Sequence, residues 1–247
     1  MNDSSVDLIE WLTSDEAATP VAASVIVLHG LGADGQDFVP VVQAMNLDAI
    51  GKVRFVLPSA PVRPVTINGG YRMRAWYDIF PPPADPRLER QEDEAGLLAS
   101  SALVLRLVER EVSRGVPASR VVLMGFSQGC AMTLLAGLTA PSPLAGLVGL
   151  SGYLPLARQV GARVAGQGDS AVRTMPVFLA HGEHDDIVTP DRGRAARDAI
   201  QAMGHPVQWH SYPMGHEVCM PEIQAINAWL LQTLGQGQPP KSTAMKA

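Results

Sequence analysis

Residues 121–135 read VVLMGFSQGCAMTLL, in which Gly125, Ser127 and Gly129 form a Gly-x-Ser-x-Gly pattern. The pattern alone is a weak signal, because glycine and serine are among the commonest residues. Its context strengthens it, since an apolar, β-branched run enters the motif directly and a helical pattern leaves it directly. A tight strand-to-helix turn of this kind projects the serine hydroxyl from the edge of a sheet. The alternative is an ordinary glycine-lined turn in which Ser127 only caps the helix.

On both sides of this motif, short apolar runs alternate with helical patterns along the chain. Several runs are apolar without polar alternation, as expected for strands that are covered on both faces of a parallel sheet. The predicted class is α/β, with a mainly parallel central sheet and helices on both faces. The predicted strands are residues 25–28, 53–57, 121–124, 147–150, 177–180 and 207–212. The predicted helices are residues 92–114, 128–139, 191–203 and 222–234.

Two segments interrupt this alternation. Residues 58–86 are rich in proline, glycine and aromatic residues and are too long for a plain connection, so we expect them either to shape a binding site or to be mobile. Residues 154–173 form a second, less informative interruption.

The 247 residues show no repeat or linker and predict one α/β domain over residues 1–234. Residues 235–247, GQGQPPKSTAMKA, have little apolar surface and predict a flexible tail.

Composition and charge argue against several classes of partner. The formal net charge is −5, so phosphate backbones and anionic membranes are poorly attracted. No apolar run is long enough to span a membrane, and residues 1–19 lack the basic start and apolar stretch of a secretory signal. The two cysteines, Cys130 and Cys219, cannot build a framework of disulfides. We therefore expect a soluble, cytoplasmic protein that binds no nucleic acid and does not insert stably into membranes.

Ser127 is the candidate nucleophile. At a helix start, the helix dipole and the free N–H of Gln128 would point to where negative charge develops on an attacked carbonyl oxygen. Cys130 competes for this role, because a thiolate near a helix start would be activated. One step past the turn, however, its side chain should point into the packed helix, where a small buried residue is the usual role.

A serine nucleophile needs an imidazole to accept its proton and a carboxylate to orient that imidazole. In hydrolases with this turn, the acid and then the histidine follow the serine, each at a strand end. His216, in the segment MGHEV after the last predicted strand, meets this order. The strand before it ends in HGEHDDIVTP, and its pattern does not separate the last two of its three carboxylates, Glu183, Asp185 and Asp186. The remaining histidines lie in or before a strand or stand in the wrong order: His29, His181, His184, His205 and His210.

The cluster of histidines and carboxylates at residues 181–186 could instead hold a metal ion. So many neighbours in one tight turn rarely converge on a single ion, and no His-Glu-x-x-His pattern is present. We therefore expect no metal.

A glycine loop after the first predicted strand suggests a different class of enzyme. HGLGADG contains a literal Gly-x-Gly-x-x-Gly at Gly30, Gly32 and Gly35, a pattern typical of dinucleotide-binding enzymes. The next strand ends in PSAP instead of the acidic residue that this function requires, and Pro40 interrupts the helix that should follow. The loop could alternatively supply an oxyanion-hole amide near Leu31, facing the amide at the helix start.

Together, these motifs resemble the phospholipase/carboxylesterase family of α/β-hydrolases, which includes bacterial carboxylesterases and acyl-protein thioesterases. The resemblance runs from about residue 25 to about residue 231 and is carried by HGLGADG, RPVTINGGYRMRAWYDI, QEDEAG, GFSQG, HGEHDD and PMGHEV. The segments INGGY and YPMGHEV are closer to the bacterial carboxylesterases. Cys130 stands where the family commonly has glycine, and Glu183 and His184 also depart from the thioesterases, which leaves substrate choice open.

The resemblance also implies roles for individual residues. The catalytic triad would be Ser127, Asp185 and His216. The oxyanion-hole amides would be those of Leu31 and Gln128. Residues expected to line the acyl side of the pocket, unless they are ordinary packing residues, are Trp76 and Ile187.

The function that the resemblance implies is that of a serine carboxylesterase, which forms an acyl-enzyme and needs no cofactor. The substrate would be a small ester or thioester, or an acylated protein, and either a monomer or a homodimer fits. An acyl-protein thioesterase or lysophospholipase that acts on longer acyl chains is the alternative. More remote alternatives are a dinucleotide-binding enzyme and an inactive binding protein on a hydrolase scaffold.

Overall fold

The computed structural model describes residues 7–14, 16, 19–85, 88, 90–166 and 174–235. Within these ranges, a seven-stranded sheet has the order β1-β3-β2-β6-β7-β8-β9, and β4 and β5 form a separate hairpin. The β1–β3 pair is antiparallel and the other neighbours in the large sheet are parallel. The strands are β1 (Leu8–Leu12), β2 (Ala23–Leu28), β3 (Val53–Pro58), β4 (Val62–Val65), β5 (Tyr71–Arg74), β6 (Val121–Phe126), β7 (Gly146–Leu150), β8 (Val177–Gly182) and β9 (Val207–Tyr212). The α-helices are α1 (Val39–Gln43), α2 (Glu94–Ser113), α3 (Gln128–Leu138), α4 (Ala157–Ala165), α5 (Pro190–Ala202) and α6 (Met220–Gly235).

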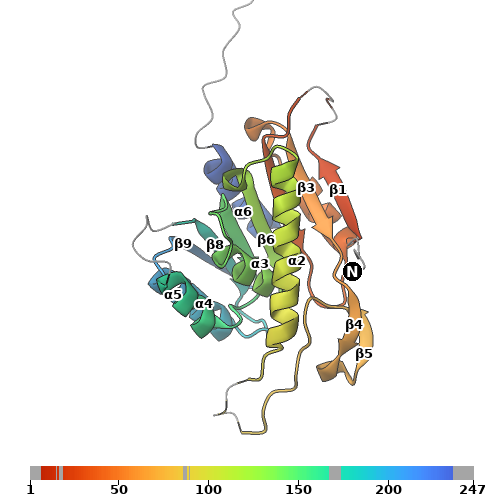
Figure 1. The fold of residues 1–247 in the computed structure, drawn as a ribbon, viewed down its shortest axis with the longest axis vertical. Helices are drawn as coiled ribbons and strands as arrows, with labels where there is room; N and C mark the ends of the chain where they lie inside the picture. The colour runs from red at the N-terminus through yellow and green to blue at the C-terminus, as the bar shows by residue number, and fades with distance from the viewer. Residues whose placement is uncertain are drawn as a thin grey trace, which may run out of the picture.

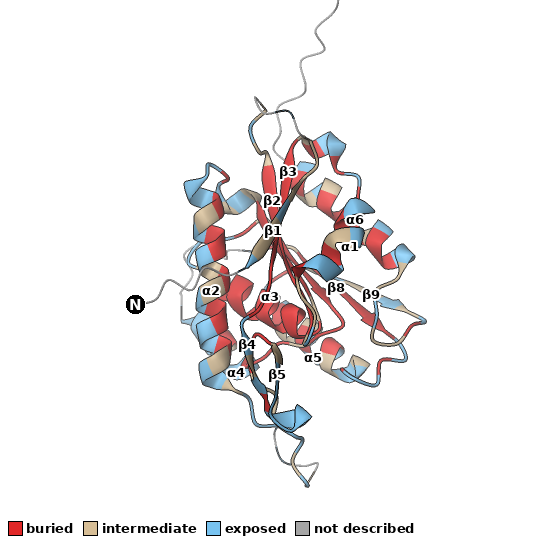
Figure 2. Ribbon diagram, turned by 90° about the vertical axis from the view of Figure 1, so that its right-hand side faces the viewer, coloured by how far each residue is buried: buried red, intermediate tan, exposed pale blue. Residues whose placement is uncertain are grey.

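The sheet lies between two layers of helices. One hydrophobic cluster joins α2, α3, α4 and α5 to one face, and a second joins α1 and α6 to the other (Figure 2). The long helix α2 crosses in front of the sheet in Figure 1. Strands β2, β3, β7 and β8 are buried along their whole length, which explains why their sequences lack polar alternation.

The predicted α/β class is confirmed, and each of the six predicted strands lies within an observed strand. The strands and α-helices that were not predicted are β1, α1, α4 and the two strands of the β4–β5 hairpin. The edge strand β1, LIEWL, is only half-buried and carries no continuous apolar run. Helix α4 lies inside the interruption at residues 154–173, whose residues 167–173 lie outside the described part of the chain.

The segment at residues 58–86, expected either to shape a site or to be mobile, contains the β4–β5 hairpin. The hairpin follows β3 and projects beyond the end of the large sheet (Figure 1). Thr66–Asn68 forms a 3₁₀ turn between its strands, and Ile67 and Asn68 line the cavity described below. The segment therefore shapes a cavity.

The predicted boundary between the domain and the tail lies at the end of α6. Gly235, assigned to the tail, is instead the last residue of α6. The rest of the predicted tail, residues 236–247, lies outside the described residues. A single domain over residues 1–234 stays a prediction.

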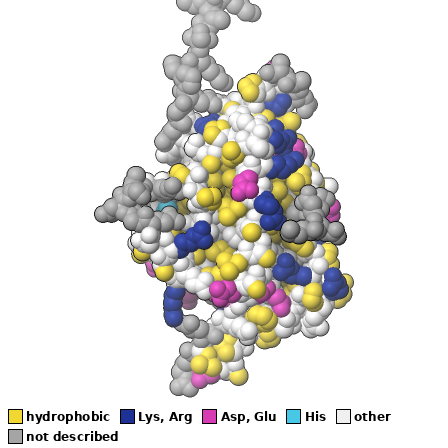
Figure 3. Space-filling view, in the orientation of Figure 1, with side chains coloured by type: hydrophobic (Ala, Val, Ile, Leu, Met, Phe, Trp, Pro, Cys, Tyr) yellow, Lys and Arg dark blue, Asp and Glu magenta, His cyan; other side chains and the backbone are white. Residues whose placement is uncertain are grey.

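The surface shown in Figure 3 carries basic and acidic side chains interspersed among apolar ones. In the ranges that the structure describes, no helix has both the length and the apolar character needed to cross a membrane.

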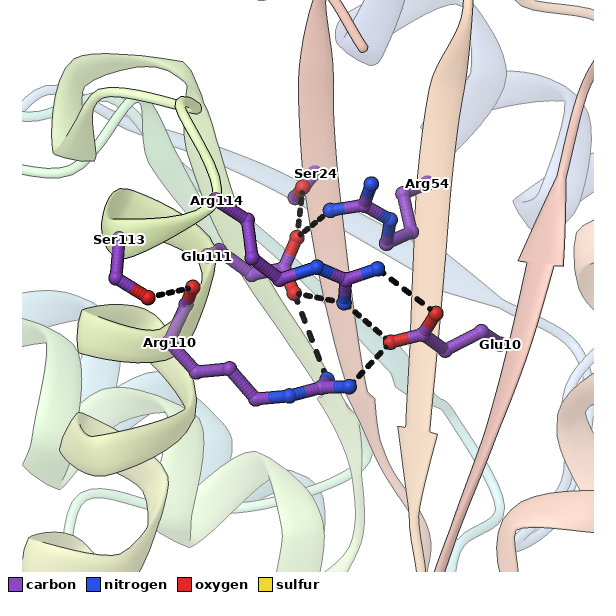
Figure 4. A network of polar contacts seen from close by, with 7 residues as sticks. All are labelled: Glu10, Ser24, Arg54, Arg110, Glu111, Ser113 and Arg114. Carbon is purple, nitrogen blue, oxygen red and sulfur yellow. Dashed lines mark hydrogen bonds and ion pairs between the residues drawn. The ribbon is translucent and has the colours of Figure 1, made fainter. Parts of the chain in front are cut away.

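A network of charges joins α2 to strands β1, β2 and β3 (Figure 4). The side chain of Glu111 on α2 is fully buried, and its Oε2 accepts hydrogen bonds from Ser24 Oγ and Arg54 Nη1, both at 2.7 Å. Its Oε1 accepts from Arg114 Nη1 at 3.1 Å, and Arg114 also donates to Glu10 on β1. These partners replace the water that a buried carboxylate loses. The network therefore ties the edge strand to the helix.

Glu10 makes part of this network depend on pH. The hydrogen bond from Arg114, together with Arg110 nearby, lowers the pKa of Glu10 from 4.5 to about 2. Because the folded pKa is depressed, the contribution of Glu10 to stability is present above pH 4.5 and is lost as the pH falls towards 2. Glu10→Gln is expected to lower the free energy of unfolding at neutral pH by about 1–2 kcal/mol, because solvent screens these partly exposed partners.

Urea unfolding of both proteins at neutral pH and at about pH 3 measures this difference, which should shrink at the lower pH. Glu109→Gln is the matched control, because Glu109 is exposed on α2, the helix whose arginines contact Glu10. A Glu10→Gln difference that stays constant over this pH range would contradict the assignment.

Candidate active site

Ser127 occupies a strained turn between β6 and α3. Its backbone has φ 55° and ψ −116°, in the left-handed half of conformational space that side chains rarely adopt. A Cβ on Gly125 would lie 2.3 Å from the Gly129 carbonyl oxygen, and one on Gly129 would lie 2.0 Å from the Leu28 carbonyl oxygen. Both glycines of the motif are therefore required by close backbone packing. The turn places Ser127 directly after β6 and on the wall of a cavity.

Three residues that are distant in the sequence form one hydrogen-bonded chain. Ser127 Oγ lies 2.8 Å from His216 Nε2, and His216 Nδ1 lies 2.7 Å from Asp185 Oδ2. Ser127 follows β6, Asp185 follows β8, and His216 lies between β9 and α6. The chain assembles there because β6, β8 and β9 are parallel and end at the same edge of the sheet.

The structure separates the carboxylates that the sequence left equivalent. The Asp185 side chain is fully buried, and its Oδ1 accepts hydrogen bonds from the backbone N–H groups of Ile187 at 3.0 Å and Val188 at 2.8 Å. These two donors fix the carboxylate so that Oδ2 faces His216. Asp186 and Glu183 are exposed.

The hydrogen bonds also select the tautomer of His216. A carboxylate can only accept, so Nδ1 carries the proton and Nε2 is left as an acceptor for the serine hydroxyl. The ring of Phe126 packs against the imidazole with 4.7 Å between ring centroids. His216 is therefore oriented to receive a proton from Ser127.

His181 belongs to the support of this site. Its Nε2 lies 2.7 Å from the Val188 carbonyl oxygen and 3.4 Å from Asp185 Oδ2, and burial lowers its pKa. The imidazole is thus neutral near pH 7 and braces the turn that carries Asp185. Among the described residues, no group of three or more histidine, cysteine, aspartate or glutamate side chains is arranged to hold a metal ion.

The two predicted oxyanion amides border the same cavity as Ser127. Leu31 and Gln128 both line it, and within the described ranges neither backbone N–H donates to another group of the protein. The Gln128 side chain ties α3 to the segment after β5, because its Oε1 accepts from Trp76 N–H at 2.7 Å and its Nε2 donates to the Tyr77 carbonyl at 2.8 Å. This clamp was not predicted.

His29, set aside in the sequence because of its position, supports the glycine loop. Ala60 N–H donates to its Nε2 at 2.9 Å, so its Nδ1 carries the proton and lies 2.6 Å from the Gly30 carbonyl oxygen. Burial lowers the pKa of His29 and keeps it neutral. These bonds orient the peptide that precedes Leu31. A histidine directly before the glycine loop is the signal that could have revealed this role.

Trp76, which was expected either to line the pocket or to be a packing residue, does not line the cavity. Its side chain is fully buried, its Nε1 donates to the His29 carbonyl at 2.9 Å, and it packs against the His29 ring. An indole N–H that finds a buried acceptor is typical of a packing residue. Ile187 does line the cavity and is 68% exposed.

Cys130 is 1% exposed and points into the core, as expected, and burial raises the pKa of its thiol to about 12. A thiol with this pKa is protonated and unreactive near neutral pH.

The cavity beside Ser127 has a volume of about 730 Å³. Phe38, Val41, Phe126 and Val218 form an apolar part that continues the core around α1 and α6. Tyr77, Tyr153 and Arg192 form a more polar part on the side of α5.

Comparison with known proteins relates this site to a family. The family model for phospholipase/carboxylesterase matches residues 14–234. Acyl-protein thioesterase 1 of Neurospora crassa is 41% identical over 86% of this chain and 87% of its own length, and that of Gibberella zeae is 38% identical over 92% and 95%. In structure, acyl-protein thioesterase 2 of Zea mays is similar with a TM-score of 0.78 at 30% identity, covering 92% of this chain and 99% of that one. The chain therefore belongs to the phospholipase/carboxylesterase family of α/β-hydrolases.

Proposed function

We propose that this serine hydrolase cleaves carboxylic esters and thioesters with Ser127 as nucleophile, His216 as proton carrier and Asp185 as the group that orients His216. The observation that supports it best is the pair of hydrogen bonds at 2.8 Å and 2.7 Å that joins these side chains beside the cavity. Esterase and thioesterase chemistry share this machinery, because both pass through an acyl-serine.

The reaction has two halves. Ser127 Oγ attacks the carbonyl carbon as its proton passes to His216 Nε2, and the carbonyl electron pair moves onto oxygen. When the carbonyl re-forms, the bond to the leaving alcohol or thiol breaks, and His216 returns the proton to that group. Water then attacks the acyl-serine in the same way and releases the carboxylic acid, which restores the Ser127 hydroxyl.

The backbone amides of Leu31 and Gln128 stabilise the negative oxygen of each intermediate. They suit this role because they line the cavity and have no competing acceptor within the described residues. One such donor contributes about 2.7–4 kcal/mol to transition-state stabilisation. Two side-chain hydrogen bonds help to fix these amides: His29 bonds to the Gly30 carbonyl oxygen next to Leu31, and the Gln128 side chain bonds to the Tyr77 carbonyl oxygen.

The apolar part of the cavity suits an acyl chain. Each buried CH₂ group contributes about 0.8 kcal/mol, so kcat/KM should rise about fourfold or less per carbon until this part is filled. Two similar proteins are named acyl-protein thioesterase 1, and this name supports thioesters, including those of acylated proteins, as substrates of this enzyme. A lysophospholipid is the second candidate, since its single long acyl chain would use the same apolar part.

Two free cysteines, Cys130 and Cys219, fit a reducing, cytoplasmic setting.

A fluorophosphonate probe and a graded substrate panel test this function. The probe is expected to form one adduct, on Ser127, which peptide mass spectrometry locates. A panel of p-nitrophenyl esters and matched thioesters of increasing acyl length is expected to show turnover that rises with length. Folded protein that forms no adduct and hydrolyses no member of the panel would favour the binding protein on a hydrolase scaffold.

A further inference from the structure

Arg192 lies at the polar part of the cavity in a fixed position. It is the third residue of α5, and its guanidinium carbon lies 3.5 Å from the centre of the Tyr153 ring. This stacking holds the cation by its attraction to the ring face, while the edge of the guanidinium keeps its N–H donors free. Both residues line the cavity that contains Ser127.

Arg192 has no ion-pair partner among the residues that the structure describes. The other two arginines of α5 are paired at the surface, Arg194 with Asp191 at 2.7 Å and Arg197 with Asp198 at 2.8 Å. An arginine that is held in place but unpaired, on the wall of a substrate cavity, is suited to bind an anionic group of a ligand.

A hydroxyl pair beside Arg192 adds a second donor. Tyr77 and Tyr153 are hydrogen-bonded through their hydroxyl oxygens at 2.8 Å, and burial raises the pKa of Tyr77 well above 10. The Tyr77 phenol is therefore protonated near neutral pH. Two hydroxyl protons serve only one mutual hydrogen bond, so the second proton is available to an acceptor in the cavity.

The other charged side chains that line the cavity are mostly acidic and limit the anion that fits: Asp37, Asp78, Arg90, Glu92, Asp93 and Glu217. Two of them, Asp78 and Asp93, accept hydrogen bonds from backbone N–H groups. The Asp78 carboxylate accepts from Thr66 N–H at 2.7 Å, and the Asp93 carboxylate accepts from Gly96 N–H at 2.9 Å. Their negative charge opposes a phosphate monoester, which carries about two charges, more than it opposes a single carboxylate. A planar carboxylate also matches the two parallel N–H groups of a guanidinium.

We propose that Arg192 and the Tyr153 hydroxyl bind a carboxylate on one arm of the ester substrate. Strand β6, which carries Ser127, lies between β2 and β7 in the sheet. The glycine loop after β2 thus lies on one side of the serine, and Tyr153 and Arg192, which follow β7 and β8, lie on the other. One arm of the substrate occupies the apolar part and the other reaches Arg192. The inference rests on the proposed function and names its substrate class, an ester with one anionic arm.

Matched substrate pairs test the proposal. In the first pair, p-nitrophenyl octanoate is compared with mono-p-nitrophenyl suberate, which places a carboxylate on the acyl arm. In the second, butyl octanoate is compared with the octanoyl ester of 4-hydroxybutanoate, which places it on the alcohol arm. The octanoyl ester of 4-hydroxybutyl phosphate tests a phosphate instead. The readout is the ratio of kcat/KM for the charged and neutral members of each pair.

In one of the two pairs, the wild-type enzyme is expected to prefer the carboxylate. Arg192→Met should lower that ratio about tenfold or more, as expected for a charge-assisted hydrogen bond. Tyr153→Phe keeps the ring face for Arg192 and should lower the ratio by a smaller factor. Arg194→Met, on the same helix but outside this cavity, is the matched control and should leave the ratio unchanged. The wild-type preference should also weaken as salt is added.

Equal ratios for the wild type and Arg192→Met in both pairs would overturn the proposal, as would a stronger preference for the phosphate. Hydrolysis of the neutral esters by the wild type separates this failure from failure of the proposed function. Because each ratio compares two substrates of one protein sample, partial misfolding of a variant does not imitate the expected result.

Discussion

Replacing Ser127 with alanine is expected to lower kcat for ester hydrolysis by about 10⁴- to 10⁶-fold. The hydroxyl oxygen is the atom that forms the acyl bond, and alanine provides no substitute for it. Folding should be preserved, because alanine keeps the Cβ at this strained turn and the lost hydroxyl is hydrogen-bonded only to His216 in the described structure. Initial rates on a short p-nitrophenyl ester measure the change, and thermal unfolding checks the fold.

Ser113→Ala is the matched control for this variant. Ser113 is exposed at the end of α2, where its hydroxyl donates to a carbonyl of the same helix. Its loss should leave both kcat and fluorophosphonate labelling unchanged. Near-normal turnover by Ser127→Ala would rule out Ser127 as the nucleophile.

Asp185→Asn is expected to lower kcat by about 10⁴-fold while the geometry is kept. The backbone N–H groups of Ile187 and Val188 require an acceptor at the Oδ1 position, so the amide oxygen should settle there. The NH₂ group then faces His216 Nδ1 and donates to it, which moves the imidazole proton to Nε2. In that tautomer Nε2 cannot accept the proton of Ser127.

Asp186→Asn provides the comparison, since Asp186 is the exposed neighbour that the sequence did not distinguish from Asp185. Its rate should stay within about twofold of the wild type, because an exposed carboxylate outside the hydrogen-bonded chain is screened by solvent. Steady-state kinetics of the two variants on one ester decide between the carboxylates. A large loss in Asp186→Asn with a small one in Asp185→Asn would reverse their roles.

The local features of the site could be predicted from residues that are close in the sequence. The turn at Ser127 needs an apolar strand, two glycines and a helix within a few residues, and the structure contains all three. The burial of Cys130 also follows from helix geometry. The buried parallel strands could be recognised because strands covered on both faces are apolar at every position.

Features that depend on packing against distant segments were predicted poorly. Strand β1 is held by its pairing with β3 and by the contacts of Glu10 with α2, and neither is visible in the pattern LIEWL. The sequence left Trp76 either in the cavity or as a packing residue, since an aromatic residue in an irregular loop suits either a pocket or a core. Its burial is decided by His29 and Gln128, which lie far from it in the sequence.

The amino-acid sequence was enough to predict the fold class, the serine turn and the order of serine, acid and histidine, because these follow from periodicity and from local backbone sterics. The residue pattern left Asp185 and Asp186 equivalent and only the resemblance chose between them, whereas the folded structure shows which carboxylate faces His216 and which arginine faces the cavity. Asp185 and Asp186 are neighbours of one chemical type, as are the arginines of α5. What separates them is the direction of each side chain relative to the sheet edge, which is set by hydrogen bonds and ring contacts across the fold.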